Sequence, residues 1–295
     1  MGVTSIEKAR RWFAEDLRYC AGVRSQAVVD AFAAVPRERF LAPGPWRLRS
    51  SMGALPIAYW TTDDADPHHL YHDVLVAIDE RRGLNNGQPS LWARLYDELE
   101  LRPGERVVHV GAGTGYYSAV LAELVGPEGH VAAIEVDPIL AVRARENLVP
   151  WPQVDLLAAD GFAHHPDPPA NAIVVNAGVS SIPETWLDGL VPGGGRLLVP
   201  LTVGWDGGFL LVTRPTAPGV PWPVRFVSRT GIIPCVGGHH AEADARLAAA
   251  LTQSHPSSVQ SLRRSPEPPD ATCWLAGDGW WLSTEPGAPP MSALG

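Results

Sequence analysis

The chain has 295 residues, a hydrophobic fraction of 45% and a formal net charge of −9. This length allows one or two domains with a large buried core. The negative charge argues against a nucleic-acid partner, because binding a phosphate backbone needs a basic face. No uninterrupted apolar run approaches the roughly 18 residues that would indicate a membrane span.

Cysteine use and the first residues bear on the cellular compartment. Cys20, Cys235 and Cys273 are widely separated and form no Cys-x-x-Cys pair, so a disulfide framework is not expected. The first residues include no apolar segment of the kind found in secretory signals. We therefore expect a cytoplasmic protein. The sequence does not indicate its oligomeric state.

The first 84 residues are predicted to form a helical, lid-like region. Thr4 and Glu7 form a capping-box pattern at the start of one helix, and Ser25 is a candidate cap for a second. Residues 41–70 are rich in Pro, Ser, Asp and His and are predicted to be an irregular connection. The side chains expected to face inward are Ile6, Phe13, Leu17 and Cys20 in the first helix, and Val28, Val29, Phe32 and Val35 in the second.

Strands and helices alternate over residues 85–213, which predicts an α/β core. Such alternation indicates a Rossmann-like, doubly wound and mostly parallel sheet with helices on both faces. Ligands of such sheets bind at the carboxyl ends of the strands. Strands are expected at 107–110, 131–136, 154–158, 172–176 and 196–201, and helices at 91–99, 116–125 and 184–190.

Residues 214–295 are predicted to be an α+β extension. A strand is expected at Val224–Val227 and a helix at Ala241–Leu251, and Thr272–Ser283 has the pattern of a β-hairpin with Gly277-Asp278-Gly279 at its turn. The extension would help to shape an acceptor pocket. Alternatively it is a packing flap, because tryptophans more often supply buried area than ligand contacts. The stretch from Glu285 is expected to be disordered.

A glycine-rich loop follows the first core strand. Without side chains at Gly111, Gly113 and Gly115 the backbone can turn sharply and approach a ligand closely. A dinucleotide site would need a further glycine where Tyr116 stands, so the spacing favours a ligand without a pyrophosphate, such as S-adenosylmethionine. Thr114 is a candidate cap for the helix that follows. The residues assigned to the cofactor around this loop are His109, Gly111, Ala112, Gly113, Thr114 and Gly115.

Two acidic positions complete the predicted cofactor site. Glu135 ends the second core strand, 24 residues after Gly111, where a carboxylate holds the ribose hydroxyls of an adenosine. Asp160 and Gly161 follow the third strand and are placed to meet the adenine edge. The glycine loop alone could be an ordinary turn. With both acidic positions in order, it predicts an adenosine-sulfonium site.

A set of segments between Ile6 and Leu201 is more particular than the glycine loop. The segments are Ala34-Val-Pro-Arg-Glu-Arg-Phe40, Gly87-Gln-Pro-Ser90, Gly111-Ala-Gly-Thr-Gly-Tyr116, Ala119-Val-Leu-Ala-Glu-Leu-Val-Gly126, Ile182-Pro183 and Gly194-Gly-Arg-Leu-Leu-Val-Pro200. In this combination the chain resembles the protein-L-isoaspartate O-methyltransferases and their bacterial relatives. The resemblance implies S-adenosylmethionine as cofactor and methyl transfer to a carboxylate.

The chain departs from that family at two positions. The family usually has Thr-Ile-Ser before Gln-Pro, and its hydroxyl is thought to hold the substrate carboxylate. Here the segment reads Asn85-Asn86-Gly87. The amide donors of Asn85, Asn86 and Gln88 could replace that hydroxyl, or the two asparagines could simply form a turn before Gly87. The family also usually has Glu or Asp where this chain has His109.

Other residue clusters were weighed as sites. His68 and His72, with His69 and Asp73 nearby, have metal-compatible helical spacing, and Cys235 lies close to His239 and His240. Neither set is complete, so no metal is expected and polar turns are the simpler interpretation. His109 could serve as a base, but a histidine inside a strand is more often a core residue.

Three functions remain open from the sequence. The first is a carboxyl O-methyltransferase that acts on an isoaspartyl or related peptide carboxylate. The second is a methyltransferase of the same fold that acts on a specialised small molecule or a biosynthetic peptide. The third is a non-catalytic protein that binds S-adenosylmethionine. No nucleic-acid or membrane partner is expected.

Overall fold

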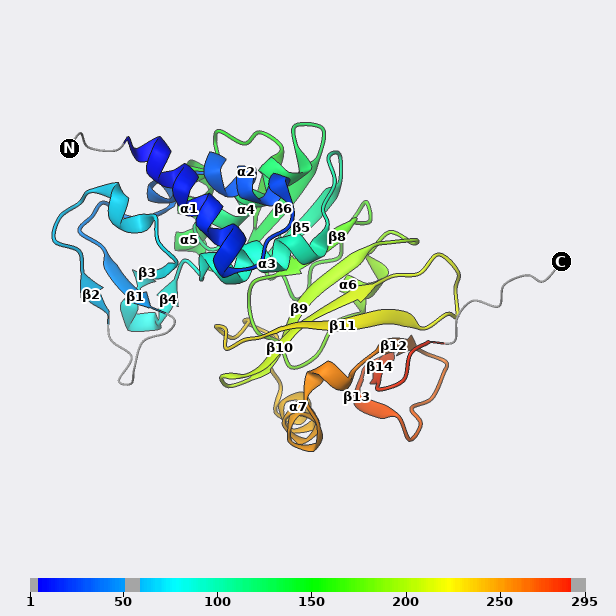
Figure 1. Cartoon of the computed structure of the whole chain (residues 1–295). Coiled ribbons are helices and arrows are strands. Elements are labelled where there is room, and N and C mark those ends of the chain that lie inside the picture. Colours follow the sequence, from blue (N-terminus) through cyan, green and yellow to red (C-terminus); the bar gives the residue numbers. More distant parts are fainter. Residues whose placement is uncertain (1–4, 51–58, 288–295) are drawn as a thin grey trace. The chain divides into compact units, whose positions relative to one another are not determined.

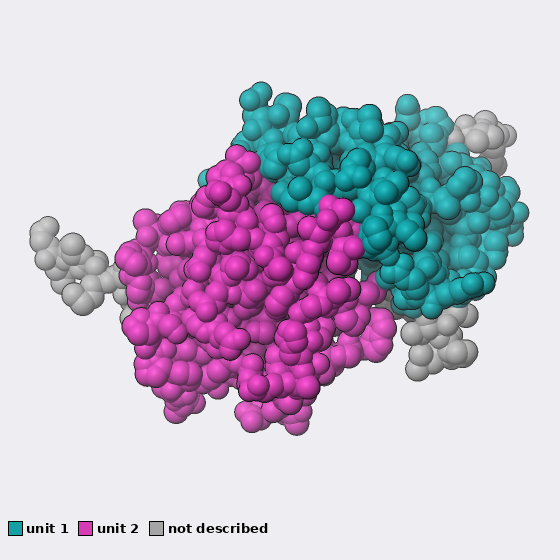
Figure 2. Space-filling view, turned by 180° about the vertical axis from the view of Figure 1, so that it is seen from behind, with its two compact units in different colours: residues 1–104, 112–133, 137–157 teal, residues 105–111, 134–136, 158–295 magenta. Residues whose placement is uncertain are grey.

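The computed structural model describes residues 5–50 and 59–287. The chain forms two compact units (Figure 2). Unit 1 comprises residues 1–104, 112–133 and 137–157, and unit 2 comprises residues 105–111, 134–136 and 158–295.

Helices make up most of unit 1. They are α1 (Ile6–Cys20), α2 (Gln26–Ala34), α3 (Pro89–Leu99), α4 (Tyr116–Val125) and α5 (Pro138–Asn147), with short 3-10 turns η1 (Arg37–Phe40), η2 (Pro67–Leu70) and η3 (Glu80–Arg82). α3 and α4 confirm the predicted helices, and α1 and α2 confirm the helical start of the chain (Figure 1).

The faces of the first two helices agree largely with the prediction. Val28, Val29, Phe32 and Val35 are buried, as are Phe13 and Leu17. Cys20, in contrast, is exposed at the end of α1. The cap of α1 is Ser5, whose side chain accepts a hydrogen bond from Lys8 N, and Thr4 lies outside the described residues. Ser25 precedes α2 but makes no side-chain cap hydrogen bond.

A small antiparallel sheet lies in the same unit, and two of its four strands fall in residues 41–70, where an irregular connection was predicted. Its strands are ordered β2 (Trp60–Thr61), β1 (Arg47–Ser50), β3 (Val74–Asp79) and β4 (Leu84–Asn85). Leu48 and Val76 of this sheet share a hydrophobic core cluster with Leu41, Trp46 and Leu70. The prediction of an irregular connection was therefore wrong at β1 and β2. The strands are two to six residues long and pair across long separations, as Leu48 does with Val76, so no local pattern marks them.

The larger sheet has ten strands in the order β13-β14-β12-β11-β10-β9-β8-β5-β6-β7. β5, β8 and β9 pair in parallel, and the strands from β9 to β13 pair antiparallel. The sheet is therefore mixed, and the strands predicted for the core are confirmed. Their bounds are β5 Arg106–Val110, β6 His130–Glu135, β7 Val154–Ala158, β8 Ala172–Val175, β9 Arg196–Val203, β10 Asp206–Thr213, β11 Trp222–Arg229, β12 Ser261–Arg264, β13 Cys273–Gly277 and β14 Trp280–Ser283. The helices of unit 2 are α6 (Glu184–Asp188) and α7 (Ala241–Gln253), with the 3-10 turn η4 (Pro256–Ser258).

The predicted tryptophan-rich hairpin is present as β13 and β14. Gly277 pairs with Trp280, so the turn residues are Asp278 and Gly279. The side chains of Trp280 and Trp281 are 2% and 1% exposed, and Trp280 Nε1 donates to the carbonyl oxygen of Ile182 at 2.7 Å. These tryptophans are packing residues, which favours the packing interpretation of the hairpin.

The end of the described chain continues this edge of the sheet. Ser261 Oγ donates to the carbonyl oxygen of Glu285 at 2.6 Å, so Glu285 itself is tied to β12. Residues 288–295, most of the stretch expected to be disordered, lie outside the described residues.

Candidate active site

Gly111 stands at the carboxyl end of β5 and begins the glycine loop. Its φ of +81° is in the left-handed region, which glycine adopts without strain. Its backbone N–H donates to the carbonyl oxygen of Ile134 at 2.9 Å. A Cβ atom at this position would lie 3.4 Å from the carbonyl oxygen of Asn176. The first residue of the loop is therefore closely packed between Ile134 of β6 and Asn176, the residue after β8.

The loop continues through two further left-handed glycines. Gly113 has φ +59°, and within the described chain no heavy atom lies within 4 Å of the position of a Cβ there. Gly115 has φ +98°, and its Cβ would lie 3.0 Å from Leu148 Cδ1. Gly115 is also the cap of α4, without a side-chain hydrogen bond. The predicted capping role of Thr114 is wrong, because that side chain is buried one residue earlier.

Glu135 ends β6, and Asp160 lies two residues after the end of the neighbouring strand β7. The backbone N–H of Ala159 donates to the carbonyl oxygen of Glu135 at 3.1 Å. The Glu135 side chain is 7% exposed, and Asp160 is exposed, with Oδ1 accepting from the N–H of Phe162 at 2.9 Å. Through the bonds at Ile134 and Ala159, unit 2 brings Gly111, Glu135 and Asp160 together.

Gly161 is required by packing. A Cβ atom there would lie 2.5 Å from Val110 Cγ1, closer than real Cβ atoms approach other heavy atoms. Its carbonyl oxygen accepts from Trp186 Nε1 at 3.0 Å. This glycine therefore lets the segment after β7 lie directly on the end of β5, which positions Asp160.

Residues 233–240 form a strap that we did not predict to be near the site. Gly178 N donates to the carbonyl oxygen of Ile233 at 2.8 Å, and Cys235 N donates to that of Gly178 at 2.7 Å. His239 Nε2 also lies 2.8 Å from the carbonyl oxygen of Gly178. These bonds attach the strap to the loop that follows β8.

The strap lies beside the two acidic side chains. Gly237 has φ +77°, and its Cβ would lie 3.4 Å from Asp160 Oδ2. Burial, and then the carboxylates of Asp160 and Glu135, raise the pKa of the Cys235 thiol to about 11. The thiol is therefore protonated at neutral pH. Part of the rise in its pKa comes from the negative charges of Asp160 and Glu135 at this end of the sheet.

His109 lies inside β5 and is completely buried, opposite Val174 of β8. Burial lowers its pKa to about 3, so the imidazole is neutral at physiological pH. This environment favours the interpretation of His109 as a core residue over that of a base.

The segment that would hold the acceptor belongs to unit 1. Asn86 is 8% exposed and pairs with Val76 of β3 in both directions: its N–H donates to the Val76 carbonyl oxygen, and its Oδ1 accepts from Val76 N at 2.9 Å. Asn85 Oδ1 accepts from Gly87 N at 2.9 Å. The predicted asparagine turn is therefore present. The Asn85 amide nitrogen makes one long contact, 3.5 Å from the Gly83 carbonyl oxygen.

Gln88 is part of a side-chain network around Asp73. Gln88 Nε2 donates to Asp73 Oδ2 at 3.0 Å and to Ser90 Oγ at 2.9 Å. Ser90 donates to the same carboxylate through its backbone N–H and its hydroxyl, at 2.8 and 2.7 Å. Asp73 therefore fixes the start of α3 and the amide of Gln88.

Residues 47–214 match the family described as protein-L-isoaspartate(D-aspartate) O-methyltransferase. The chain belongs to this family. Among its relatives, the protein-L-isoaspartate O-methyltransferase of Ignicoccus hospitalis is 35% identical over 64% of this chain and 80% of its own length. Protein-L-isoaspartate O-methyltransferase 2 of an Anaeromyxobacter species is 35% identical over 75% of this chain and 83% of its own.

A solved structure supports the same fold. It is described as a putative protein-L-isoaspartate O-methyltransferase from Plasmodium falciparum in complex with S-adenosyl-L-homocysteine, and it matches with a TM-score of 0.59 and 17% identity. The match covers 77% of this chain and 97% of that one. The predicted fold class, the enzyme class of S-adenosylmethionine-dependent methyltransferases and the cofactor are therefore confirmed.

The Val-Pro-Arg-Glu-Arg-Phe segment of the isoaspartate methyltransferase family has a structural role in unit 1. The Arg37 side chain is 1% exposed, and its guanidinium donates to the backbone carbonyl oxygens of Leu70, His72 and Val74. These carbonyls flank Asp73. Arg37 thus holds the segment that positions the Asp73 network.

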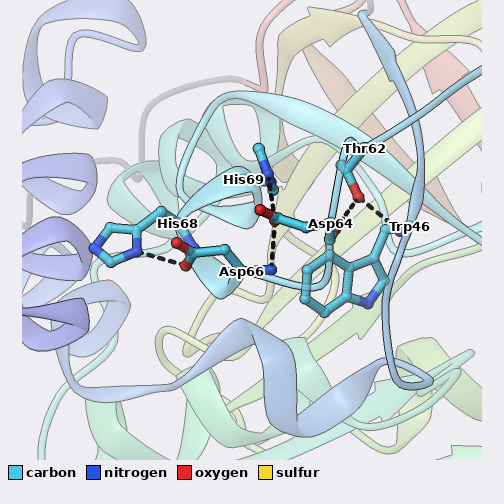
Figure 3. Close-up of polar contacts among 6 residues, drawn as sticks. All are labelled: Trp46, Thr62, Asp64, Asp66, His68 and His69. Carbon is cyan, nitrogen blue, oxygen red and sulfur yellow. Dashed lines mark hydrogen bonds and ion pairs between the residues drawn. The ribbon is translucent and has the colours of Figure 1, made fainter.

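Three of the histidines considered as metal ligands have carboxylate partners. His68 Nδ1 lies 2.6 Å from Asp66 Oδ1, and His69 Nε2 lies 2.9 Å from Asp64 Oδ1 (Figure 3). His239 Nδ1 lies 2.8 Å from an oxygen of Asp244. Over residues 5–50 and 59–287, no group of three or more His, Cys, Asp or Glu side chains could hold a metal ion. In the same ranges no helix has the length and apolar character that crossing a membrane requires.

Proposed function

We propose that this chain transfers the methyl group of S-adenosylmethionine to an isoaspartyl-type carboxylate of a peptide. In this proposal Gly111, Glu135 and Asp160 hold the cofactor, and Asn85 holds the acceptor. The observation that supports it best is the convergence of the first three residues at the strand ends of unit 2, through the hydrogen bonds at Ile134 and Ala159. This convergence occurs in a chain that belongs to the isoaspartate methyltransferase family.

The residues present fit the cofactor. Glu135 offers a largely buried carboxylate, and a ribose diol supplies two hydroxyl donors to such an acceptor. Gly113 leaves open space where a side chain would otherwise stand, so a ligand can approach the backbone. The cofactor supplies a methyl group activated by a sulfonium. The remaining loop positions Ala112, Thr114 and Gly115, together with Gly161, would shape this site. His109 would support the loop from within the core.

Because the cofactor supplies the activated methyl group, the main contribution of the protein is to position the acceptor. A carboxylate with an ordinary pKa near 4 is ionised at neutral pH and needs no general base. Correct alignment of two reacting groups is worth roughly 7 to 11 kcal/mol in favourable intramolecular cases. We therefore assign to the acceptor segment the binding and orientation of a carboxylate.

Among the amide side chains of that segment, Asn85 is the best candidate donor. The amide nitrogen of Gln88 already donates to Asp73 and Ser90. Asn86 is buried, and its Oδ1 accepts from Val76 N, whereas Asn85 is only half-buried. The Asn85 amide nitrogen makes only the 3.5 Å contact with Gly83 in the described structure. Its Oδ1 is occupied by Gly87 N, so the nitrogen is the atom that would donate to an acceptor carboxylate.

The test is transfer of a radiolabelled methyl group from S-adenosylmethionine to an isoaspartyl peptide, with the aspartyl peptide of the same sequence as acceptor control. We expect a base-labile ester on the isoaspartyl peptide alone. Asn85→Asp keeps the oxygen that accepts from Gly87 but removes the donor. It should raise KM for the peptide roughly 10- to 150-fold, the equivalent of one hydrogen bond to a charged group.

The control variant is Gln253→Glu, which changes the net charge equally at an exposed position of α7. It should leave KM unchanged. An Asn85→Asp enzyme with the KM of the unmodified chain would show that the acceptor is held elsewhere.

A second function is favoured by one observation at Gly87. The family hydroxyl is missing there, and the residue has φ +73°, so the acceptor site differs from that of an enzyme specialised in isoaspartyl repair. The corresponding acceptor would be the carboxylate of a specialised small molecule or a biosynthetic peptide. Transfer to such a compound without transfer to the isoaspartyl peptide would favour this function. A cytoplasmic location stays a prediction from the sequence.

A further inference from the structure

Gly87 is enclosed by two aromatic side chains of unit 1. A Cβ atom at this position would lie 2.9 Å from Trp92 Nε1, 2.9 Å from Tyr117 Cε2 and 3.2 Å from Trp92 Cδ1. Real Cβ atoms essentially never approach other heavy atoms within 3.0 Å. Position 87 is therefore closed to any side chain while Trp92 and Tyr117 keep their places.

The two aromatic residues are firmly held. Trp92 and Tyr117 are 1% and 3% exposed, and their ring centroids are 5.2 Å apart. The Tyr96 ring contacts both, with centroid distances of 5.7 and 6.2 Å, and Phe32 packs on Tyr117 at 6.4 Å. Close-packed interiors of this kind do not absorb added atoms without strain.

Two other glycines serve as controls that distinguish steric collision of a side chain from strain of the left-handed backbone. Gly22 and Gly83 have φ values of +67° and +69°, close to the +73° of Gly87. In the described structure, no heavy atom lies within 4 Å of a Cβ at either position. A side chain at Gly22 or Gly83 would cost only backbone strain, whereas one at Gly87 would also collide with the aromatic pair.

We infer that Trp92 and Tyr117 determine the acceptor specificity of this enzyme. They exclude the hydroxyl-bearing side chain from position 87, so this position offers the acceptor only its backbone. The Cβ atom of a serine placed there would collide with the aromatic pair. The assignment of the segment to the acceptor rests on the proposed function, but the exclusion of a side chain rests on packing alone.

Thermal unfolding of the full chain tests the exclusion. Gly22→Ser should lower Tm by roughly 2 to 8 °C, the effect of left-handed strain in a chain of this size. Gly87→Ser should lower Tm at least twice as far. In a Trp92→Leu background, or in a Tyr117→Leu background if the first variant folds poorly, adding Gly87→Ser should lower Tm by less than it does in the unmodified chain, because one of the two colliding side chains is gone. Equal losses for Gly87→Ser and Gly22→Ser in the unmodified background would overturn the inference.

Methylation of an isoaspartyl peptide tests the specificity. Comparison of Trp92→Leu with Trp92→Leu/Gly87→Ser should show KM falling about tenfold on adding the serine, with a smaller change in kcat, because one hydrogen bond to the carboxylate is gained. An unchanged KM in a stable double variant would refute the role in specificity. If the unmodified chain does not use this peptide and the double variant does, the proposed function fails while the inference is supported.

Discussion

Replacing Glu135 by glutamine changes the charge of the proposed ribose ligand while keeping its shape. Glu135 is 7% exposed at the end of β6, so its carboxylate is poorly screened by solvent. A hydrogen bond to a charged group contributes about 1.5 to 3 kcal/mol, and one between neutral groups about 0.5 to 1.5 kcal/mol. A glutamine also directs an NH₂ group toward one of the two hydroxyl donors. We therefore expect a loss of about 1 to 3 kcal/mol in binding, or roughly 5- to 150-fold in Kd.

The assay is isothermal titration of S-adenosylhomocysteine into the full chain and into the Glu135→Gln variant. Glu128→Gln, which alters an exposed carboxylate, is the matched control and should bind like the unmodified chain. A Kd within twofold of the unmodified value for Glu135→Gln would refute the assignment of this side chain to the cofactor.

The same variant has a second readout that needs no ligand. The Glu135 carboxylate is one of the groups that raise the pKa of the Cys235 thiol, after burial and Asp160. Removing its charge should lower that pKa, because a negative neighbour disfavours the thiolate. The pH dependence of Cys235 alkylation, measured with Cys20 and Cys273 replaced by serine, should therefore shift to lower pH. No shift would mean that the side chains do not interact.

Three further predictions concern stability. Arg37→Lys should destabilise the fold by about 1.5 to 3 kcal/mol in urea unfolding, since one ammonium cannot reach three backbone carbonyls; unchanged stability would contradict this role. The pKa of His109 is lowered to about 3 in the folded state. Between about pH 6.5 and pH 3 the unfolded state therefore binds more protons than the folded state, and the free energy of unfolding falls as the pH falls through this window. His109→Leu should remove about 1.4 kcal/mol of the stability loss between pH 7.5 and pH 5.5, and an unchanged pH slope would refute the buried neutral histidine. Gly161→Ala, whose Cβ would lie 2.5 Å from Val110 Cγ1, should cost about 1 to 3 kcal/mol in Tm-derived stability and weaken S-adenosylhomocysteine binding; normal binding would separate Gly161 from the site.

The parts of the fold that local chemistry dictates could be predicted. A run of valines before Gly111 gives β5, and the Gly277-Asp278-Gly279 segment gives the turn between β13 and β14. Each of these elements is specified by residues that are neighbours in the sequence. Gly111, Glu135 and Asp160 could be placed at one end of a sheet for the same reason, because each lies at the end of its own strand or within two residues after it.

Elements that depend on distant partners were missed. The second and third residues of β10 are Gly207 and Gly208, which weaken strand propensity and resemble a loop. Their reason is visible only in the sheet, where a Cβ at Gly207 would lie 2.0 Å from the carbonyl oxygen of Leu201 and one at Gly208 would lie 2.3 Å from Phe226 Cε2. Glycine is thus required at both positions because the neighbouring strands β9 and β11 leave no space for a side chain.

Only part of the candidate site could be predicted, because its other features also depend on residues that are distant in the sequence. The missing hydroxyl at Gly87 is evident from the sequence, but its enclosure by Trp92 and Tyr117 requires the fold. The strap of residues 233–240 has no periodic pattern, and its contact with Asp160 spans more than 70 residues of sequence. The Gly237-Gly238 pair was the one signal that a close backbone approach occurs there.

A crystal structure of the full chain with S-adenosylhomocysteine tests the central claim most directly. We expect the nucleoside to contact the carboxyl ends of β5, β6 and β7, with its ribose hydroxyls on Glu135 and its adenine beside Asp160. Density for the ligand at another place, or an unoccupied Glu135 in crystals that contain the ligand, would contradict the account.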